Sequence, residues 1–237
     1  MLFRSDGVLL LQDIKRTTTR IAGNGSASLW DIGDGVVCLE FHTKMNSIDP
    51  GIMAMVEKVL KVVPAENYKA LIIHSEAANF SVGANIGLAL FAANIAGWPE
   101  ITKSIKAGQD AYQALKYAPF PVVGAPSGMA LAGGLEILLH CDAVQAHAET
   151  YMGLVEVGVG LVPAWGGCKE MLARWHHNPK GPQGPMPAVT RVFETIGTAT
   201  VARSADEARD FLFLRDGDGI TMKDRKSTRL NSSHVKR

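Results

Sequence analysis

Three short apolar runs constrain the fold of this chain more than any other feature. Each run leads through a loop into a helix-like segment or a small-residue stretch. They are Lys69–His74 (KALIIH), Pro121–Ala125 (PVVGA) and Ala143–His147 (AVQAH). Apolar runs of this length are typical of parallel strands that are buried on both faces. Parallel strands need long crossover connections, which are right-handed. The sequence therefore predicts a layered α/β domain built from repeated β–loop–α units.

Signals between these runs predict the other elements. Leu29–Phe41 holds two β-prone stretches separated by Gly33-Asp34-Gly35, which is the pattern of a hairpin. Asp49 followed by Pro50 predicts the start of a helix. Gly87–Tyr117 predicts one or two helices, the second starting after Pro99, and Gly133–His140 predicts another. Helices thus alternate with strands over residues 28–176, as an α/β fold requires.

Composition excludes several classes of protein. Of the 237 residues, 47% are hydrophobic and 20% are charged, which suits a chain with a sizeable core. The 24 Lys and Arg residues nearly balance the 23 Asp and Glu residues, so neither a nucleic-acid surface nor a polybasic membrane anchor is expected. The sequence has no apolar run of about 18 residues and no signal-peptide pattern. Cys38, Cys141 and Cys168 lie far apart, which argues against a disulfide framework or a zinc site and favours the cytoplasm.

The segment Asn79–Ile86 (NFSVGANI) is the first of three that suggest chemistry. It follows the predicted strand that ends near His74. Gly83 and Ala84 are small enough for a ligand to approach their backbone amides closely. The same pattern fits an ordinary strand-to-helix turn, so this segment alone leaves both interpretations open.

The second segment is Ser127–Glu136 (SGMALAGGLE). Its glycine pair, Gly133 and Gly134, lies at a predicted helix start, where unpaired N–H groups stabilise an anion or an enolate. Glu136 is followed by Ile-Leu-Leu in an apolar helix, and a carboxylate is costly to bury there unless it has a function. The alternative is a glutamate that faces solvent on an amphipathic helix.

The third segment is Met152–Pro163 (MGLVEVGVGLVP). Glu156 is the one charged residue between Glu149 and Lys169, so it too is a candidate for function. The pair Gly158-x-Gly160 does not form a dinucleotide-binding loop, because no third glycine follows at the required spacing and Pro163 interrupts.

Together the three segments resemble motifs of the crotonase, or enoyl-CoA hydratase/isomerase, superfamily. They are similar, in order, to F-x-x-G-A-D-[IL], G-G-G-x-E-[IL] and G-x-P-E-x-x-x-G-x-x-P. Pro121-Val122-Val123 resembles the strand before the second motif, and Lys44-Met45-Asn46-Ser47 resembles the K-x-L-N segment of the CoA pocket. The resemblance spans roughly residues 29–175. It implies an α/β crotonase (ClpP-like) fold of repeated ββα units that form a superhelical core.

The resemblance also implies roles for individual residues. The amides of Ala84 and Gly133 match the pair that forms the oxyanion hole of the family, and Glu136 and Glu156 match its catalytic glutamates. By this analogy Glu136 activates water and Glu156 transfers a proton at C2, and the two roles can be shared. The positions that match substrate-binding residues are Lys44, Val82, Gly83, Asn85, Ile86, Gly134 and Pro163. No metal ion and no further cofactor are expected, because CoA is part of the substrate.

The implied activity is that of an enoyl-CoA hydratase, which adds water to 2-enoyl-CoA and gives 3-hydroxyacyl-CoA in fatty-acid β-oxidation. An enoyl-CoA isomerase, which generally needs one glutamate, is the alternative enzyme. A non-catalytic acyl-CoA-binding module of a larger multifunctional enzyme is the alternative without catalysis. The expected partners are the acyl-CoA thioester and either further copies of the chain, in a homotrimer or a dimer of trimers, or a covalently joined 3-hydroxyacyl-CoA dehydrogenase domain.

Four positions depart from the motifs of the family. Ala132 stands in place of the first glycine of the glycine triple, and Val155 in place of the proline before Glu156. Asn85 replaces an aspartate and Ser127 replaces the common asparagine. None of these changes removes a donor amide or a carboxylate, so they loosen the assignment of the substrate rather than of the reaction class.

The chain is expected to divide into three parts. Residues 1–27 are expected to be a linker or the remnant of a preceding domain. Residues 28–224 are expected to be the crotonase domain, with a Pro/Gly insertion at 178–187 and incomplete C-terminal helices. Residues 225–237 are polar, basic and aperiodic, and are expected to be a non-native tail.

Several other residues are assigned no chemistry. His140, His147 and the pair His176-His177 lack the spacing of metal ligands, so they are expected to be structural or exposed. Ser204 is followed by Glu207, which predicts a capping box at a helix start.

Overall fold

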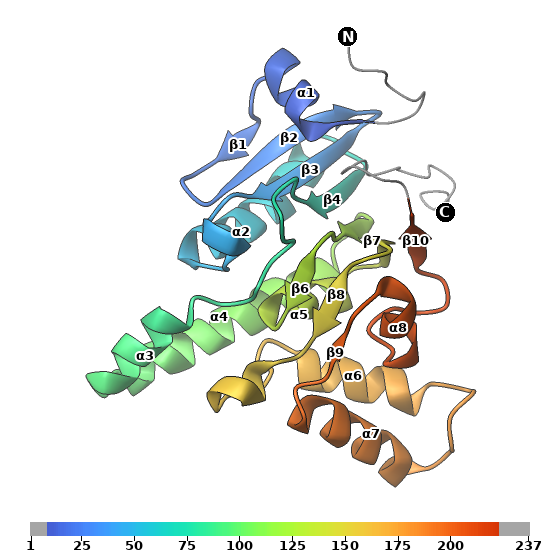
Figure 1. Ribbon diagram of the computed structural model, residues 1–237. Coiled ribbons are helices and arrows are strands. Elements are labelled where there is room, and N and C mark those ends of the chain that lie inside the picture. The colour runs from blue at the N-terminus through green and yellow to red at the C-terminus, as the bar shows by residue number, and fades with distance from the viewer. Residues whose placement is uncertain (1–8, 223–237) are drawn as a thin grey trace.

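A seven-stranded sheet forms the centre of the computed structural model, which describes residues 9–222 (Figure 1). The first three strands pair antiparallel and the others join in parallel. In spatial order the strands are β1 (Ala22–Gly23), β2 (Ala27–Gly33), β3 (Val36–Phe41), β4 (Ala70–His74), β5 (Val122–Ala125), β7 (Ala143–His147) and β10 (Gly219–Thr221). The three short apolar runs of the sequence are the adjacent strands β4, β5 and β7, so the predicted parallel sheet is confirmed.

A second sheet of three short strands occurs in the described part of the chain: β6 (Met129–Leu131), β8 (Tyr151–Gly153) and β9 (Val201–Ala202). The chain passes from β5 to β6 and into helix α5 (Gly133–Leu139), and then from β7 to β8 and onward to helix α6 (Gly167–His176). Each passage places one strand in each sheet and then a helix, which is the predicted ββα repeat.

The parallel pairing of β6 with β8 positions the candidate site. Leu131 lies opposite Gly153, and the Ala132 amide donates to the Gly153 carbonyl at 2.8 Å. Helix α5 begins two residues after Leu131, and the 3₁₀ helix η2 (Glu156–Val159) begins three residues after Gly153. The pairing therefore brings the start of α5 and the start of η2 side by side.

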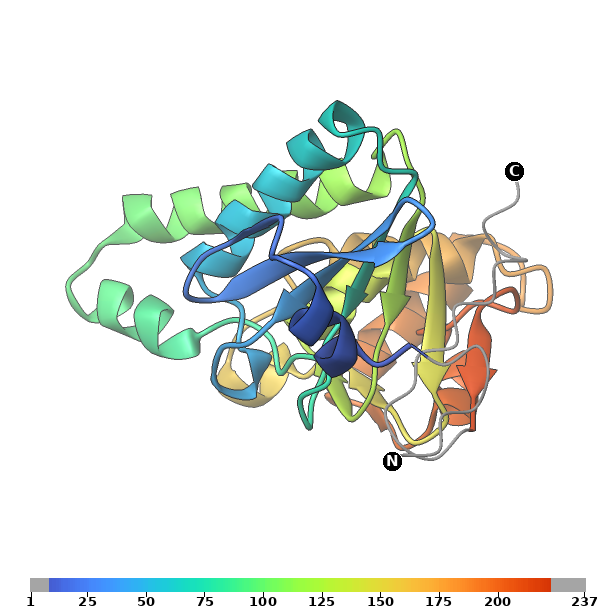
Figure 2. The same ribbon diagram turned by 90° about the horizontal axis from the view of Figure 1, so that it is seen from above.

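Two long helices cover the sheet, and a third extends from it. Helix α2 (Pro50–Ala65) packs beside α4 (Trp98–Lys116), and α3 (Ile86–Asn94) runs along the outer half of α4 (Figures 1 and 2). Asp49 caps α2 by accepting from the Ile52 amide at 2.8 Å, as the Asp-Pro pair predicted. None of the α3 side chains is buried.

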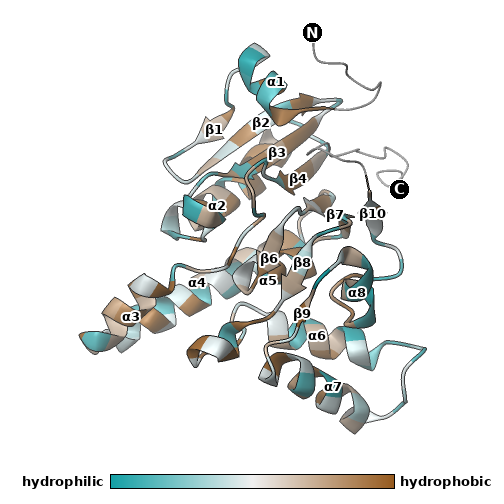
Figure 3. Cartoon of the chain, viewed as in Figure 1, coloured by the Kyte–Doolittle hydropathy of each residue, from teal (hydrophilic) through white to brown (hydrophobic). Residues whose placement is uncertain are grey.

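The remaining helical elements are α1 (Leu11–Thr17), the 3₁₀ helix η1 (Lys44–Asn46), α7 (Pro185–Gly197) and α8 (Ala205–Asp210). Ser204 Oγ caps α8 by accepting from the Glu207 amide, as the sequence predicted. Hydrophobic colour dominates the central strands in Figure 3, whereas α1 is largely hydrophilic.

Some expectations about the chain ends and helix bounds differ from the structure. Within the expected linker, Leu11–Thr17 form a helix and Ala22–Gly23 pair with β2, so this stretch is folded onto the sheet edge. The second helix of the 87–117 region starts at Trp98, one residue before Pro99, because proline is accepted in a first helical turn. The expected non-native tail, residues 225–237, lies outside the described residues, and the division into domains stays a prediction.

Candidate active site

Two backbone amides lie on neighbouring segments, the loop 79–85 and the start of α5. Ile48 bridges Ala84 in parallel: its amide donates to the Gly83 carbonyl, and its carbonyl accepts from the Asn85 amide. Because both flanking groups face Ile48, the amide of Ala84 faces the opposite side. Gly133 is the first residue of α5, so its amide has no partner within the helix. Neither amide donates to another atom within residues 9–222.

Glycines let these two segments approach each other. A Cβ atom on Gly83 would lie 2.7 Å from Ala132 Cβ and 3.0 Å from the amide nitrogen of Gly133, and Gly83 has a φ of +91°. A Cβ atom on Gly134 would lie 2.5 Å from the Ser81 carbonyl oxygen. Side chains at these positions would separate the two amides, so the glycines are needed for two donors to converge on one acceptor oxygen.

Glu136 lies in the first turn of α5 and is 2% exposed. Its Oε1 accepts from the Gly167 amide, at the start of α6, at 2.8 Å. The pKa of Glu136 is raised to about 8, chiefly by burial, with a further contribution from the charge of Glu156 and against the lowering effect of the backbone hydrogen bonds from Gly167 and Trp165. The carboxyl group is therefore held by backbone donors and is mostly protonated at neutral pH.

Glu156 begins η2, and both of its carboxyl oxygens are buried without a hydrogen-bond partner among the described residues. Burial raises the pKa of Glu156 to about 7. A buried carboxyl group with unfilled hydrogen-bonding capacity is costly and is typical of a site that receives a polar ligand. The charge of Glu156 acts on Glu136, so the two carboxyl groups lie near each other.

The predicted substrate-binding positions differ in their exposure. Gly83, Gly134 and Pro163 are buried, Val82 is half-buried, and Lys44, Asn85 and Ile86 are exposed. Asn85 caps α3 by accepting from the Gly87 amide at 3.2 Å.

The 3₁₀ helix η1, which carries Lys44, is fixed to the loop 79–85. The Asn46 side chain donates to the Asn79 carbonyl, and Ser81 Oγ donates to the Asn46 carbonyl. The structure therefore brings the segment that resembles the CoA-pocket motif beside the loop that carries the Ala84 amide.

Sequence reasoning missed several residues that shape the site. The Gly167 amide donates to Glu136 across 31 positions of the chain, and Tyr112 Oη donates to the Gly133 carbonyl at 3.0 Å. Trp165 packs its ring on Gly133 and on Tyr112, with ring centroids of the two aromatic residues 5.6 Å apart. Burial raises the pKa of Cys168, and the charges of both glutamates raise it further, so the thiol stays protonated near the site. The glycine pair at 166–167 was the one signal in the sequence for this group.

Across residues 9–222, no helix is both long and apolar enough to cross a membrane. The same residues contain no cluster of three or more His, Cys, Asp or Glu side chains arranged to hold a metal ion.

Comparison with known proteins gives one family and relatives whose names refer to fatty acid oxidation or 3-hydroxyacyl-CoA. The family model described as enoyl-CoA hydratase/isomerase matches residues 31–175. A probable 3-hydroxyacyl-CoA dehydrogenase of Bacillus subtilis is 43% identical over 212 residues, which cover 90% of this chain and 26% of that protein. A putative fatty acid oxidation complex trifunctional enzyme of Rickettsia prowazekii is 34% identical over 168 residues, or 70% of this chain and 23% of that protein. The chain thus spans about a quarter of the length of these relatives.

Solved structures support the fold. An enoyl-CoA hydratase from Bacillus anthracis superposes with a TM-score of 0.67 at 21% identity, covering 83% of this chain and 70% of that one. A putative enoyl-CoA hydratase from Streptomyces coelicolor gives a TM-score of 0.70 at 18% identity, covering 88% and 72%. The predicted α/β fold of this group of enzymes is therefore confirmed.

Proposed function

Because the chain belongs to the enoyl-CoA hydratase/isomerase family, we propose that it is an enoyl-CoA hydratase of fatty-acid β-oxidation. It adds water across the double bond of a 2-enoyl-CoA thioester and gives the 3-hydroxyacyl-CoA. CoA enters as part of the substrate, and the reaction needs neither a metal ion nor a further cofactor.

The two free amides support this reaction. When water adds to C3, negative charge develops on the thioester oxygen as the enolate forms. The amides of Ala84 and Gly133 lie on two neighbouring segments and have no acceptor among the described residues, which supports the proposal that both bind that oxygen. Removal of one such donor typically costs about 3–4 kcal/mol of transition-state stabilisation.

The observation that carries the proposal is a pair of neighbouring glutamates: Glu136 is buried, and Glu156 is half-buried with both of its carboxyl oxygens buried and without a partner among the described residues. Hydration needs one carboxylate to take a proton from water and one carboxylic acid to give a proton to C2. The pKa values of about 8 for Glu136 and about 7 for Glu156 leave the pair with one proton at slightly alkaline pH. An isomerase has no water to activate, so a second carboxyl group in the same site favours hydration.

The order of the two pKa values bears on the roles of the glutamates. Because Glu136 is buried more deeply, the shared proton resides mainly on Glu136 in the free protein. Water activation by Glu136 therefore requires that this proton pass to Glu156 when substrate binds, and Glu156 then gives a proton to C2.

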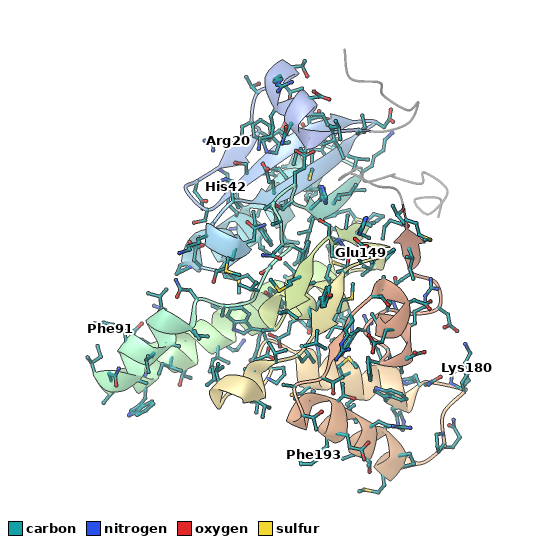
Figure 4. The ribbon with its side chains drawn as sticks, viewed as in Figure 1. Arg20, His42, Phe91, Glu149, Lys180 and Phe193 are labelled. Carbon is teal, nitrogen blue, oxygen red and sulfur yellow. The ribbon has the colours of Figure 1, made fainter. Side chains whose placement is uncertain are left out.

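The substitution Glu156→Gln tests the proposal, because it keeps the size of the side chain and removes its acid–base chemistry. We expect hydration of a short 2-enoyl-CoA, followed by loss of the conjugated-thioester absorbance, to fall by about 100-fold or more. Binding of the CoA ester, measured by calorimetry, should persist. The matched control is Glu149→Gln, which changes an exposed carboxyl group (Figure 4) and should retain activity. Full hydration by the Glu156 variant would contradict the assignment.

A second assay separates hydration from isomerisation. The unaltered chain is mixed with a 3-enoyl-CoA and, separately, with a 2-enoyl-CoA. Conversion of the first to the second without formation of 3-hydroxyacyl-CoA would favour the isomerase. Tight binding of both with no turnover would favour a non-catalytic acyl-CoA-binding module.

We also propose that the chain works in an assembly in the cytoplasm. The exposed apolar helix α3 supports association in a homotrimer or a dimer of trimers, because Leu90 and Phe91 are each 65% exposed. Figure 4 shows Phe91 on this helix. A covalently joined dehydrogenase is the other proposed partner, because the proposed product is a 3-hydroxyacyl-CoA and the Bacillus subtilis relative is named as a probable dehydrogenase of such compounds. Light scattering after size exclusion measures the assembly, and a monomer at every concentration would refute self-association.

A further inference from the structure

Behind Glu136 lies a second buried carboxylate, Glu170, on helix α6. Glu170 is 4% exposed. Lys116 Nζ, on α4, contacts both of its oxygens at 2.7 and 2.8 Å, and Lys169 Nζ contacts Oε1 at 2.8 Å. Burial raises the pKa of Glu170, but the hydrogen bonds from Lys116 and Lys169 outweigh burial and lower it. Glu170 is therefore an ionised anchor between α4 and α6.

His140 lies between this anchor and the catalytic glutamate. It directly follows α5 and is 2% exposed. Its Nδ1–H donates to the Glu136 carbonyl at 2.7 Å, and its Nε2 lies 3.6 Å from Glu170 Oε1. A Cβ atom on Gly166 would lie 2.6 Å from His140 Cε1, so the imidazole packs directly on the Gly166 backbone.

These contacts surround the hydrogen bond from the Gly167 amide to Glu136. The Glu170 amide donates to the Gly166 carbonyl at 2.9 Å, which fixes the turn that begins α6. The next residue, Gly167, donates its amide to Glu136 Oε1. His140 therefore contacts the backbone of Glu136 on one side and the turn that supplies the donor to its carboxyl group on the other.

We propose that His140 and Glu170 are positioning residues that hold the Gly167 N–H against the carboxyl group of Glu136. This proposal rests on the proposed hydration only in its expected effect on the hydration rate. The positioning of the hydrogen bond does not depend on it. A purely apolar contact would fill the same space without the cost of burying an ionised carboxylate and an imidazole. The sequence had assigned His140 no role beyond structure or exposure.

The charged and titratable groups around Glu136 affect its pKa when the contacts of His140 and Glu170 are lost. They are Glu156 on η2, Tyr112 on α4 and Cys168 on α6. Lys116, Lys169, Glu170 and Tyr112 face His140. The Gly167 hydrogen bond favours the ionised form of Glu136. If the turn shifts, that bond weakens and the pKa of Glu136 rises further.

The test compares the full chain with His140→Leu and Glu170→Gln. Leucine keeps an apolar volume without the donor, and glutamine keeps the shape of Glu170 without its charge. We expect kcat for 2-enoyl-CoA hydration to fall about 10- to 100-fold while KM changes by less than about threefold. The acidic limb of the kcat profile should move to higher pH. The variant His140→Asn, whose amide can replace Nδ1–H as donor, should recover most of the rate. The control is Lys106→Gln, which removes an exposed Lys–Asp pair elsewhere on α4.

A direct titration separates this proposal from the proposed function. The carboxyl carbon of Glu136 is followed by NMR in glutamate-labelled protein and assigned with Glu136→Gln. A higher Glu136 pKa in His140→Leu and Glu170→Gln, and a value near that of the unaltered chain in His140→Asn, supports positioning. An unchanged Glu136 pKa in folded His140→Leu and Glu170→Gln overturns it, even where stability falls. Absence of hydration by the unaltered chain would refute the hydratase and leave this titration decisive.

Discussion

Glu136 is 2% exposed, and its burial raises its pKa to about 8, far above the ordinary value of 4.5. Between these two values the folded chain binds more protons than the unfolded chain. The free energy of unfolding must therefore fall as pH rises from about 4.5 to about 8. Glu156 acts in the same direction up to about pH 7. The two glutamates thus make the protein less stable at the pH where one of them is ionised.

The substitution Glu136→Gln should reduce this dependence. Glutamine keeps an oxygen for the Gly167 amide and cannot ionise. We expect the drop in unfolding free energy between pH 5 and pH 9, measured with urea, to shrink by on the order of 1–3 kcal/mol. The exposed Glu57→Gln is the matched control and should keep the original drop. An equal drop in Glu136→Gln and the unaltered chain would contradict the burial argument.

Ala132 offers a second prediction at a single residue. It has a φ of +50° at the cap of α5, in the position where the family motif carries glycine. A non-glycine residue in such a conformation costs about 1–3 kcal/mol, which exceeds the entropic cost of about 0.5–1 kcal/mol for glycine. Ala132→Gly should therefore stabilise the fold in urea, and Ala132→Val should destabilise it. A less stable Ala132→Gly variant would contradict the argument that the backbone of Ala132 is strained.

The sequence identified the glutamates and the glycines of the site because each is unusual within its own segment. A lone acid in an apolar run and a glycine pair at a helix start are local signals. The supporting contacts give no such signal. Tyr112 reaches Gly133 across 21 positions and Gly167 reaches Glu136 across 31, so both depend on how α4 and α6 pack. The catalytic and binding roles themselves stay predictions.

At the scale of elements, one face of α4 fits the segment 163–170 closely. Gly108, Gln109, Tyr112, Gln113 and Lys116 recur at helical spacing and contact, in turn, Trp165, Ala164, Gly133, Lys169 and Glu170. This face contacts both Gly133 and the start of α6. A change in the packing of α4 is therefore expected to alter the candidate site, although no residue of this face need contact the substrate.

Gly108→Ala tests this packing. A Cβ atom there would lie 2.2 Å from Trp165 Nε1. The gain in helix propensity is about 0.5–1 kcal/mol, whereas overpacking costs about 1–3 kcal/mol, so the variant should be less stable and its Trp fluorescence altered. Combining it with Trp165→Leu should recover about 1 kcal/mol through coupling of the two sites. Additive losses in the double variant would show that the indole is not the obstacle.

The elements that the sequence predicted well are those whose own residues determine them. Strand β7 matches its predicted range, and β2 and β3 form the hairpin predicted from the glycine-rich turn between them. The strands β6, β8, β9 and β10 have two or three residues each and exist through pairing with distant segments, so no local pattern indicated them. Helix α1 was not predicted as an element within the expected linker 1–27, and its start depends on a distant residue: the Leu11 amide donates to Glu76, 65 positions away.

At the scale of the whole molecule, the last described strand closes the main sheet. β10 pairs with β7, although about 70 residues separate them, and Asp218 secures the junction. Asp218 is 4% exposed and accepts from the Val144 amide at 2.9 Å and the Arg215 amide at 2.7 Å. One buried carboxylate therefore joins the C-terminal part of the described chain to the strand beside the site.

Asp218→Ala should destabilise the whole domain, because it leaves the Val144 and Arg215 amides without their acceptor. Each buried amide that loses its partner costs about 1–3 kcal/mol, so we expect a loss of about 2–4 kcal/mol in urea unfolding. Asp216→Ala is the control two residues away. Its side chain is 77% exposed and pairs with the exposed Lys180, so its removal should cost less than about 1 kcal/mol. Equal losses in the two variants would mean that β10 is not held by Asp218, and the sheet would then close by strand pairing alone.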